Sequence, residues 1–403
     1  MKTARVAVPG VALIATTFGL ARYGYGLLVP DMRRSFGLDA TIVGLLGSGA
    51  YVTYLAATVA SISVVSRCGP RRIAIFAGLL ATAGMAIIGQ APDVSVLALG
   101  VIVAGASSGF AFPPFADVAA EHVDPGRRGD VLAAISSGTG WGVALAAPVA
   151  IALGRNWRTA WLTFAAAALV VSVTVRVLLP EAKGAVRRSR APQLKVSWFM
   201  CARSRPLLLS AFLVGLSASV YWTFGPDAVQ SAQGATMARI LFVVVGISSI
   251  GGALASQVLR RFGTASAFRL CGALLSCSLA LIIVGASRAP LTLLSGLAFG
   301  ITYNLVVAIQ VIWSDEVFAR RPSAGLAATM LMFALGQILG PTLAGIIVDR
   351  TSVSIAFGLA AGVMTLNLIM APPHTLRSAP LASRSTQPPD AYPAAPAGHC
   401  ERS

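Results

Sequence analysis

A single arginine within an apolar stretch is the residue whose chemistry most needs an explanation. Arg22 lies between Phe18 and Asp31, in a run whose other residues are uncharged and which is long enough to cross a bilayer. A guanidinium keeps its proton at any relevant pH, and placing one near a bilayer centre costs roughly 2.5–3.5 kcal/mol even on a lenient scale. We therefore expect Arg22 to face protein or water rather than lipid.

The surroundings of Arg22 leave two interpretations of its role. In a helix it shares a face with Phe18, Tyr25, Gly26 and Val29. A fixed cation beside an aromatic ring favours a site for an anionic substrate, because a guanidinium matches a carboxylate with two parallel hydrogen bonds. The alternative is structural: a buried ion pair, or a cap on the carbonyls of a broken helix. Few carboxylates lie inside the apolar runs, which favours the substrate interpretation.

Polar and aromatic side chains elsewhere in the apolar runs could complete a cavity around such a substrate. Amides and hydroxyls in hydrocarbon need partners, so they gather where helices meet or where a cavity holds water. For each one the alternative is interhelical packing or a place in an interfacial aromatic belt. The predicted substrate-binding residues are Arg22, Tyr25, Trp141, Tyr221, Trp222, Tyr303, Asn304 and Gln337, with Tyr51, Tyr54 and Gln310 as further candidates.

Two aspartates are the candidates for proton coupling or for an outer gate. Proton-driven carriers usually need a titrating carboxylate inside the membrane, whereas the 14 acidic residues here lie mostly at the ends of the apolar runs. Asp31 and Asp227 each follow a proline. Their alternative role is to cap outer helix ends or to make gate contacts. If neither titrates, we expect a uniporter, or a carrier whose substrate brings its own proton.

The composition places the chain among membrane proteins. Of its 403 residues, 56% are hydrophobic and 11% are charged, against about 25% charged in soluble proteins. The net charge of +17 could suggest nucleic-acid binding, but the basic residues fall in short segments between apolar runs, so we expect no nucleic-acid partner. The five cysteines lack metal-ligand spacing and no catalytic constellation is present, so we expect no metal, no cofactor and no enzymatic activity.

Twelve apolar runs predict an all-α protein with twelve transmembrane helices. The first run follows Lys2 and Arg5 and continues without a cleavage site, so we interpret it as a retained span rather than a signal peptide. The first six spans are 6–29, 42–65, 73–90, 94–115, 131–153 and 157–179. The next six are 207–229, 239–259, 267–286, 291–313, 326–348 and 352–370.

Four segments follow from these spans. We expect an N-terminal six-helix bundle at 1–179, a basic cytoplasmic linker at 180–205, a C-terminal six-helix bundle at 206–370 and a disordered tail at 371–403. With both termini in the cytoplasm, 23 of the 31 Lys and Arg residues lie in cytoplasmic segments and seven in outer ones. This bias predicts both ends inside a plasma membrane.

The two halves repeat one another in parallel. Gly19-Leu20, Tyr25 and Pro30-Asp31 recur as Gly215-Leu216, Tyr221 and Pro226-Asp227, always 196 residues later. Ala218 stands where the first copy has Arg22, so the halves share a frame but differ in charge. A parallel repeat of this kind is typical of transporters that bind substrate between their halves near the membrane midplane.

Several motifs together resemble the major facilitator superfamily over residues 6–370. They are Arg67-Cys-Gly69-Pro-Arg71-Arg72 with its copy Arg260-Arg261-Phe-Gly263, Trp157-Arg158-Thr-Ala-Trp161, and Gly336-Gln-Ile-Leu-Gly340-Pro341. The resemblance implies two pseudo-symmetric bundles around a central cavity. The first span is similar to that of a poorly characterised bacterial branch near the cyanate-permease-like carriers.

The sequence also departs from the superfamily pattern. Ile62 and Ser66 stand where the loop after the second span usually has Gly and Asp, so Asp117, or Asp315 and Glu316, would have to supply the acidic side of an inner gate. The predicted inner-gate residues are Arg67, Arg71, Arg72, Asp117, Arg260 and Arg261; the alternative is that the arginines only set the topology. The predicted helix-packing or hinge residues are Gly138, Gly142, Pro148, Gly336, Gly340 and Pro341.

These observations predict a monomeric secondary transporter that moves a small organic or inorganic anion by alternating access. The alternative is a proton-coupled efflux antiporter for drugs or metabolites, although the antiporter-type glycine pattern of the fifth span is only partial because Ala147 precedes Pro148. A receptor or scaffold is a third class, which a flux assay would distinguish.

Overall fold

The structure is a computed structural model that describes residues 2–182, 203–251, 255–285, 287–319 and 321–372. Within these ranges the chain is helical and contains no β-strand. The fold class predicted from the sequence is therefore confirmed. Most of the predicted linker (180–205) and nearly all of the predicted tail (371–403) lie outside the described residues.

The first half of the chain contains eight α-helices, a π-helical segment and a short 3-10 turn. They are α1 (Lys2–Ile14), the π-helix η1 (Ala15–Tyr23), α2 (Gly24–Phe36), α3 (Ala40–Cys68), α4 (Pro70–Gln90), α5 (Val94–Ala111), α6 (Pro113–His122), η2 (Pro125–Arg127), α7 (Arg128–Leu153) and α8 (Trp157–Leu178).

The second half follows the same plan. Its elements are α9 (Arg205–Gln233), α10 (Ala235–Ser249), α11 (Ala255–Phe262), α12 (Thr264–Val284), α13 (Ala289–Val317), α14 (Pro322–Arg350), α15 (Val353–Leu366) and the 3-10 turn η5 (Asn367–Met370).

Helix boundaries follow ordinary capping chemistry. The Asp39 carboxylate accepts from the backbone N–H of Ile42 at the start of α3, and the Asn156 side chain accepts from Thr159 at the start of α8. Between α3 and α4, Gly69 adopts a φ of 83°, which a residue with a side chain would rarely take, and Pro70 then begins α4. Short polar breaks thus separate long apolar helices.

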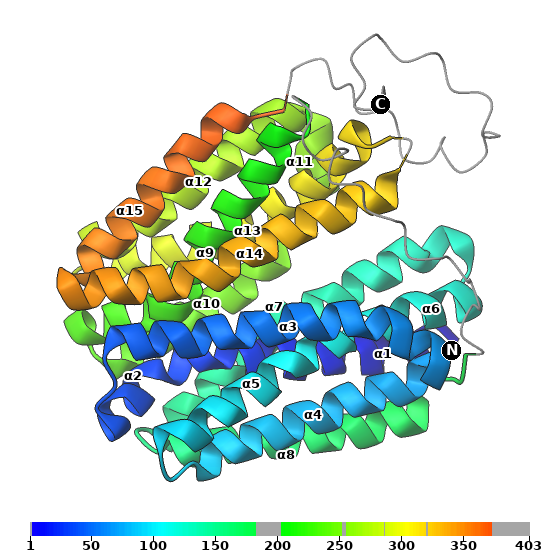
Figure 1. Cartoon of the computed structure of the whole chain (residues 1–403), viewed down its shortest axis with the longest axis horizontal. Helices are drawn as coiled ribbons and strands as arrows, with labels where there is room; N and C mark the ends of the chain where they lie inside the picture. The colour runs from blue at the N-terminus through cyan, green and yellow to red at the C-terminus, as the bar shows by residue number, and fades with distance from the viewer. Residues whose placement is uncertain (1, 183–202, 252–254, 286, 320, 373–403) are drawn as a thin grey trace.

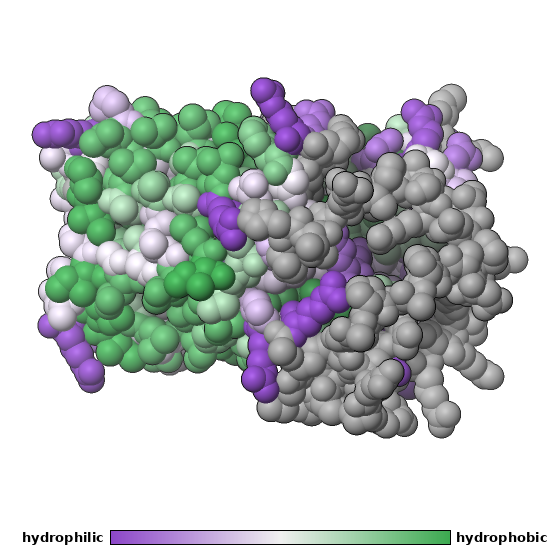
Figure 2. All heavy atoms as spheres, turned by 90° about the horizontal axis from the view of Figure 1, so that it is seen from above, coloured by the Kyte–Doolittle hydropathy of each residue, from purple (hydrophilic) through white to green (hydrophobic). Residues whose placement is uncertain are grey.

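Eleven helical segments of the described chain are long and apolar enough to cross a membrane. The exception among the twelve predicted spans is the eighth, predicted at 239–259, where α10 ends at Ser249 and α11 begins at Ala255. The first span is longer than predicted, since helical structure continues to Phe36. Figure 2 shows an apolar belt with hydrophilic groups at its edges, as expected of a surface that faces lipid.

The helices form two bundles that meet along one junction. Figure 1 shows α1 to α8 grouped in the lower part of the view and α9 to α15 in the upper part. Helix α3 packs against α14, and α7 packs against α10, across the junction. We use "the Asp31 end" for the end of the bundles near the α2–α3 connection, and "the linker end" for the end where α8 stops and α9 starts.

The backbones of the two halves approach each other closely between the Asp31 end and the middle of the helices. A Cβ on Gly44 would lie 2.2 Å from the carbonyl oxygen of Pro341, and a Cβ on Gly26 would lie 1.8 Å from that of Trp222. Only glycine allows backbones to approach so closely. Ser48 and Thr342 also exchange a hydrogen bond of 2.7 Å between their hydroxyls. In this conformation the two bundles are therefore packed together at the Asp31 end.

Candidate functional site

Arg22 belongs to a π-helical segment, which the sequence analysis did not predict. The N–H of Gly24 donates to the carbonyl of Gly19, the five-residue spacing of a π-helix. The hydroxyls of Thr16 and Thr17 donate to the carbonyl of Leu13, offering that carbonyl partners other than the helix's own N–H groups. Such segments often occur at functional sites because they re-aim side chains.

Aromatic rings surround the Arg22 guanidinium. Its central carbon lies 3.9 Å from the ring centroid of Tyr54 and 4.6 Å from that of Tyr51. The rings of Tyr23 and Phe18 lie 5.4 and 5.5 Å away. Only 7% of Arg22 is exposed. The negative faces of these rings stabilise the buried charge without cancelling it. We call Phe18, Tyr23, Tyr51 and Tyr54 the aromatic cage.

Arg22 also reaches across the junction between the halves. Its Nη2 donates to Oε1 of Gln337 at 3.1 Å, and Gln337 is itself 1% exposed. In the described part of the chain, no ion pair joins Arg22 to a carboxylate. The described residues therefore do not support the alternative that Arg22 forms a buried ion pair.

Three buried nitrogen atoms around this contact have no hydrogen-bond partner. They are Nε of Arg22, Nε2 of Gln337 and Nε1 of Trp222. Unpaired buried donors are rare in proteins because each one loses its hydrogen bonds to water. Arg22 and Trp222 line one small cavity, and Gln337 contacts Arg22 beside it.

The cavity itself is small. The space open to the centre of a water molecule is about 10 Å³, room for about one molecule. The residues that line it come from both halves: Arg22, Tyr23, Tyr25, Gly26, Gly47, Ala50, Tyr51, Trp222 and Thr223. A larger solute would bind here only after the halves move apart.

Five of the eight predicted substrate-binding residues lie at or next to this cavity. Besides Arg22 and Gln337, Tyr25 lines it and donates from its hydroxyl to the carbonyl of Val43 at 2.9 Å. The Trp222 ring lies 4.1 Å from that of Tyr23. The hydroxyl of Tyr303 lies 3.4 Å from that of Tyr23, also across the junction.

The other three predicted residues lie elsewhere. Tyr221 stacks on Phe299 at 3.8 Å and shares a hydrogen bond of 2.9 Å with Ser295, so its described contacts lie within the second half. Asn304 donates from Nδ2 to the carbonyl of Ser249 at 3.0 Å. Trp141 is 47% exposed on α7. The described contacts do not bring these three residues to the cavity.

Tyr23 is not among the residues predicted from the sequence, and Tyr51 and Tyr54 are only further candidates there. The available signal was two tyrosines three residues apart in the second span, a spacing that places both on one helix face. In a regular helix adjacent residues point in different directions, so helical periodicity does not group Tyr23 with Arg22. The π-helix changes that geometry at Arg22.

At the Asp31 end, ion pairs cross from one half to the other. Asp31 accepts from Arg34 at 2.7 Å and from Arg239 at 3.3 Å, and Arg239 also donates to the carbonyl of Gly154. Asp227 accepts from Arg33 at 2.8 Å. The two predicted aspartates therefore lie where the halves meet, and each is paired with arginine side chains.

A third aspartate at this end, Asp349, caps a helix of the other half. Its carboxylate accepts from the backbone N–H groups of Ala40 and Thr41 at 2.9 and 2.7 Å, and from the Thr41 hydroxyl at 2.6 Å. These groups form the N-terminus of α3, where a negative charge is favourable. Sequence alone could not show this contact because it joins residues more than 300 positions apart.

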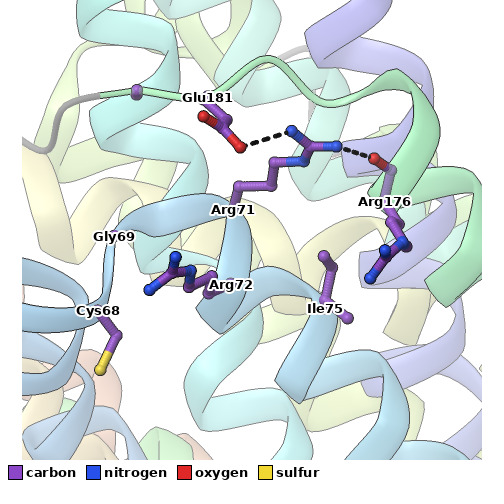
Figure 3. A pocket seen from close by; sticks show the side chains of 8 residues that line it. Cys68, Gly69, Arg71, Arg72, Ile75, Arg176 and Glu181 are labelled. Carbon is purple, nitrogen blue, oxygen red and sulfur yellow. Dashed lines mark hydrogen bonds and ion pairs between the residues drawn. The ribbon is translucent and has the colours of Figure 1, made fainter.

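Among the predicted inner-gate residues, an ion pair is described for Arg71. Arg71 pairs with Glu181 at 3.0 Å (Figure 3). This partner differs from Asp117, Asp315 and Glu316, the acids named from the sequence. The remaining gate arginines Arg67, Arg72 and Arg261 are exposed, Asp117 is partly buried in α6, and the side chain of Arg260 lies outside the described residues.

Comparison with known proteins identifies the family. Residues 14–372 match the family described as "Uncharacterised MFS-type transporter YbfB". The chain belongs to this family of the major facilitator superfamily (MFS). It is accordingly a multi-pass membrane transporter of a small-molecule substrate, and not an enzyme.

The relatives of this MFS-type transporter carry different names. The present chain is 28% identical over 373 residues to "Transcription regulatory protein OpdE" of Pseudomonas aeruginosa, and the match covers 90% of each chain. It is 23% identical over 366 residues to "Probable sulfoacetate transporter SauU" of Cupriavidus necator, covering 82% of this chain and 84% of the relative. The crystal structure of nucleoside transporter NupG superposes with a TM-score of 0.75 at 12% identity, covering 91% of this chain and 97% of that one. The structural match shows the fold.

The predicted packing residues of this MFS-type transporter lie at close helix contacts. Each glycine faces backbone atoms of a neighbouring helix: Gly138 faces Val11, Gly142 faces Ala15, Gly336 faces Phe212 and Gly340 faces Leu216. Pro148 lies inside α7 and Pro341 inside α14. The positions fit a packing role, and a hinge role stays a prediction.

Proposed function

We propose that this MFS secondary transporter moves a small organic or inorganic anion, with Arg22 as its anchor. The observation that carries the proposal is a buried permanent cation that contacts rings and an amide, and that has no carboxylate partner among the described residues. The name of the relative SauU, a probable sulfoacetate transporter, supports the same class of substrate. The resemblance of the first span to that of cyanate-permease-like carriers supports a small inorganic anion as a further possible substrate.

The unpaired donors suggest how an anion would bind. Its oxygen atoms would accept from Nε of Arg22, Nε2 of Gln337 and Nε1 of Trp222, which have no partner now. Charge-assisted hydrogen bonds of this kind are about twice as strong as neutral ones. Because Arg22 belongs to the first half and Gln337 to the second, a bound anion would contact both halves. Binding would then favour conformations that hold them at the right separation.

The proposal has a definite setting in the membrane. We propose that the protein acts as a monomer in the plasma membrane, as two six-helix bundles (1–179 and 206–370) joined by a cytoplasmic linker (180–205). The tail (371–403) would also be cytoplasmic. The bias of basic residues toward one side supports this orientation. In it, the Asp31 end is the outer end, and the packed conformation is closed to the outside.

A flux assay in proteoliposomes tests the proposal. Sulfoacetate, small carboxylates and cyanate would be offered to native protein, Arg22→Lys and Arg22→Gln, with a neutral solute of similar size for comparison. We expect anion uptake by the native protein, reduced uptake by Arg22→Lys, and a loss of at least about a hundredfold in Arg22→Gln, which leaves the acceptor without its charge-assisted bonds. Arg155→Gln is the matched control, because Arg155 is exposed in a loop.

Two outcomes would overturn the proposal. Equal anion uptake by native protein and Arg22→Gln would remove Arg22 as the anchor. Uptake or efflux of uncharged or cationic solutes only under a pH gradient would favour the proton-coupled antiporter instead. In that event Asp31→Asn or Asp227→Asn should abolish the response to the gradient.

A further inference from the structure

Two aromatic rings, one from each half of the chain, meet beside Arg22. Tyr23 belongs to η1 in the first half, and Trp222 belongs to α9 in the second. Their ring centroids are 4.1 Å apart and their planes differ by 30°, so the rings lie roughly face to face across the junction. Both residues line the small cavity at Arg22, and both are buried. Each half therefore contributes one flat ring face next to the cation.

Other rings of the second half hold the Trp222 ring in its orientation. Trp222 meets Phe299, Tyr303 and Phe242 edge-on, with centroid distances of 5.4, 5.9 and 6.0 Å. Phe299 and Tyr303 are parallel to each other, with centroids 5.6 Å apart. Edge-on and offset-parallel contacts are the favourable arrangements of aromatic pairs. These contacts lie within the second half, so they hold the Trp222 ring without help from Tyr23.

The lining of the cavity offers one positive charge and few other polar groups. Among the described residues that line it, Arg22 carries the only formal charge. Besides aromatic side chains, the lining consists of Gly26, Gly47, Ala50 and Thr223. A second anionic group on a ligand would meet no second cation here, and burying an unpaired charge is costly. The lining therefore favours a monoanion whose remaining body is apolar.

We propose that the transported anion carries a planar apolar ring, as an aryl carboxylate does, and that Tyr23 and Trp222 hold this ring between them. The inference rests on the proposed function and specifies its substrate class. The carboxylate accepts from Arg22 and Gln337, and Trp222 contributes its ring face in place of Nε1. The empty protein pairs the two rings with each other, and the ligand replaces that one contact with two.

The distances at the site suit this arrangement. The central carbon of the Arg22 guanidinium lies 5.4 Å from the ring centroid of Tyr23, so a carboxylate on the guanidinium reaches the Tyr23 face with its ring attached directly. Two ring contacts of about 3.5–4 Å each would separate Tyr23 from Trp222 by roughly 7–8 Å. The present separation is 4.1 Å. The ligand therefore enters when the halves move apart by a few ångströms at this level.

Competition for benzoate uptake tests the inference. Uptake of labelled benzoate into proteoliposomes is measured against protein-free liposomes, because benzoic acid crosses lipid unaided. Unlabelled benzoate, cyclohexanecarboxylate and terephthalate are the competitors. We expect benzoate to compete about tenfold more strongly than cyclohexanecarboxylate, from two added ring contacts, although the cyclohexane ring is the more apolar. Terephthalate should compete at least about tenfold more weakly than benzoate, because its second carboxylate would meet no cation.

Leucine variants test each ring face separately. Tyr23→Leu and Trp222→Leu each keep an apolar side chain but remove one face, so each should lower the preference for benzoate over cyclohexanecarboxylate about threefold. Tyr23→Phe keeps the face and should keep the native preference. Trp313→Leu is the matched control, because Trp313 is also buried in the second half but its described ring contact is with Phe268. The preference is a ratio, so it does not depend on how much protein folds.

The failure of this inference is distinguishable from the failure of the proposed function. Arg22-dependent uptake of small carboxylates without a preference for benzoate over cyclohexanecarboxylate would overturn the ring-binding inference alone. The absence of any Arg22-dependent anion uptake would overturn both. Equal competition by terephthalate and benzoate would overturn the assignment of a monoanion with an apolar body. A native preference in both leucine variants would overturn the role of Tyr23 and Trp222.

Discussion

At the scale of single residues, Arg22 shows how a charge is held in an apolar bundle without a counterion. Each ring of the aromatic cage contributes about 0.5–2 kcal/mol when water is excluded, and a hydrogen bond to a charged group about 1.5–3 kcal/mol. Together these exceed the roughly 2.5–3.5 kcal/mol that a central arginine costs on the lenient scale. The cage therefore stabilises the cation and leaves its charge available to a ligand.

Gln337→Glu should neutralise the positive charge of Arg22. The new carboxylate would replace an amide whose oxygen is 3.1 Å from Nη2 of Arg22, and would form an internal ion pair. We expect anion uptake to fall at least about tenfold while the midpoint of thermal unfolding stays equal or rises, because each charge gains a partner. Uptake of labelled anion and a thermal-shift assay provide the two measurements.

The control for this prediction is Gln337→Met, which is similar in size and uncharged. It removes the hydrogen bond but leaves Arg22 positive, so uptake should fall less than in Gln337→Glu. Native-like anion uptake by Gln337→Glu would contradict the role assigned to the charge.

The sequence predicted the central members of this site because polar groups in apolar runs are few and need partners. That reasoning placed Arg22, Tyr25, Trp222, Tyr303 and Gln337 together. It cannot tell which partner each group finds. Tyr221 and Asn304 satisfy the same need with Ser295 and Ser249, both in the second half.

At the scale of elements, the π-helix η1 and the close glycine contacts set the position of Arg22. Gly19 of η1 lies against Gly142 of α7, with Cα of Gly142 only 2.4 Å from where a Cβ would be. The hydroxyls of Thr16 and Thr17 donate to the carbonyl of Leu13 just before the same segment. Sequence periodicity describes regular helices, so it predicted a span here but not its winding.

Gly26→Ala should disfavour the conformation seen here. The new methyl group would meet the carbonyl oxygen of Trp222 at 1.8 Å, so α2 and α9 could not pack as they do. Alanine is the better helix former by about 1 kcal/mol, which means that helix propensity would not explain a loss. We expect slower transport and faster amide hydrogen exchange at the facing ends of α2 and α9.

Gly362→Ala on α15 is the matched control, since a Cβ there would have no other heavy atom within 4 Å. It should transport at the native rate and show native exchange. Unchanged transport and exchange in Gly26→Ala would show that the contact with Trp222 is not needed for this conformation.

At the scale of the whole molecule, ion pairs that cross the junction hold the Asp31 end together. The Asp31–Arg239 pair is buried, with side chains 4% and 7% exposed, and the Asp227–Arg33 pair is partly buried. Removing one partner of a buried pair typically costs about 3–5 kcal/mol, because the other charge stays without compensation. These pairs therefore favour the packed arrangement at this end over any arrangement that separates them.

Asp227→Arg should loosen this end, and adding Arg33→Asp should tighten it again. The single change places two arginines in contact across the junction, whereas the double change restores an ion pair with its charges exchanged. We expect faster amide exchange in the last turns of α2 and α9 in the single variant, and near-native exchange in the double one. Failure of the second change to restore protection would argue that the pair has no such role.

The overall architecture was the part that the sequence predicted best. Runs of about 20 apolar residues and the parallel repeat follow from membrane thickness and from internal duplication, which leave strong marks in any sequence. The eighth span was the exception, because its apolar run continues past the end of α10 at Ser249. Hydropathy does not mark the residue at which an α-helix ends.

The aromatic cage also determines how membrane voltage would act on a transport cycle. Because rings and an amide surround the guanidinium without neutralising it, the empty transporter keeps a positive charge near its centre. Under the proposed function, a bound monoanion would cancel that charge. A potential of 100 mV acts on one full charge with about 2.3 kcal/mol. The membrane potential would then change the rate at which the empty transporter reorients, and would have almost no effect on the rate at which the anion-bound transporter reorients.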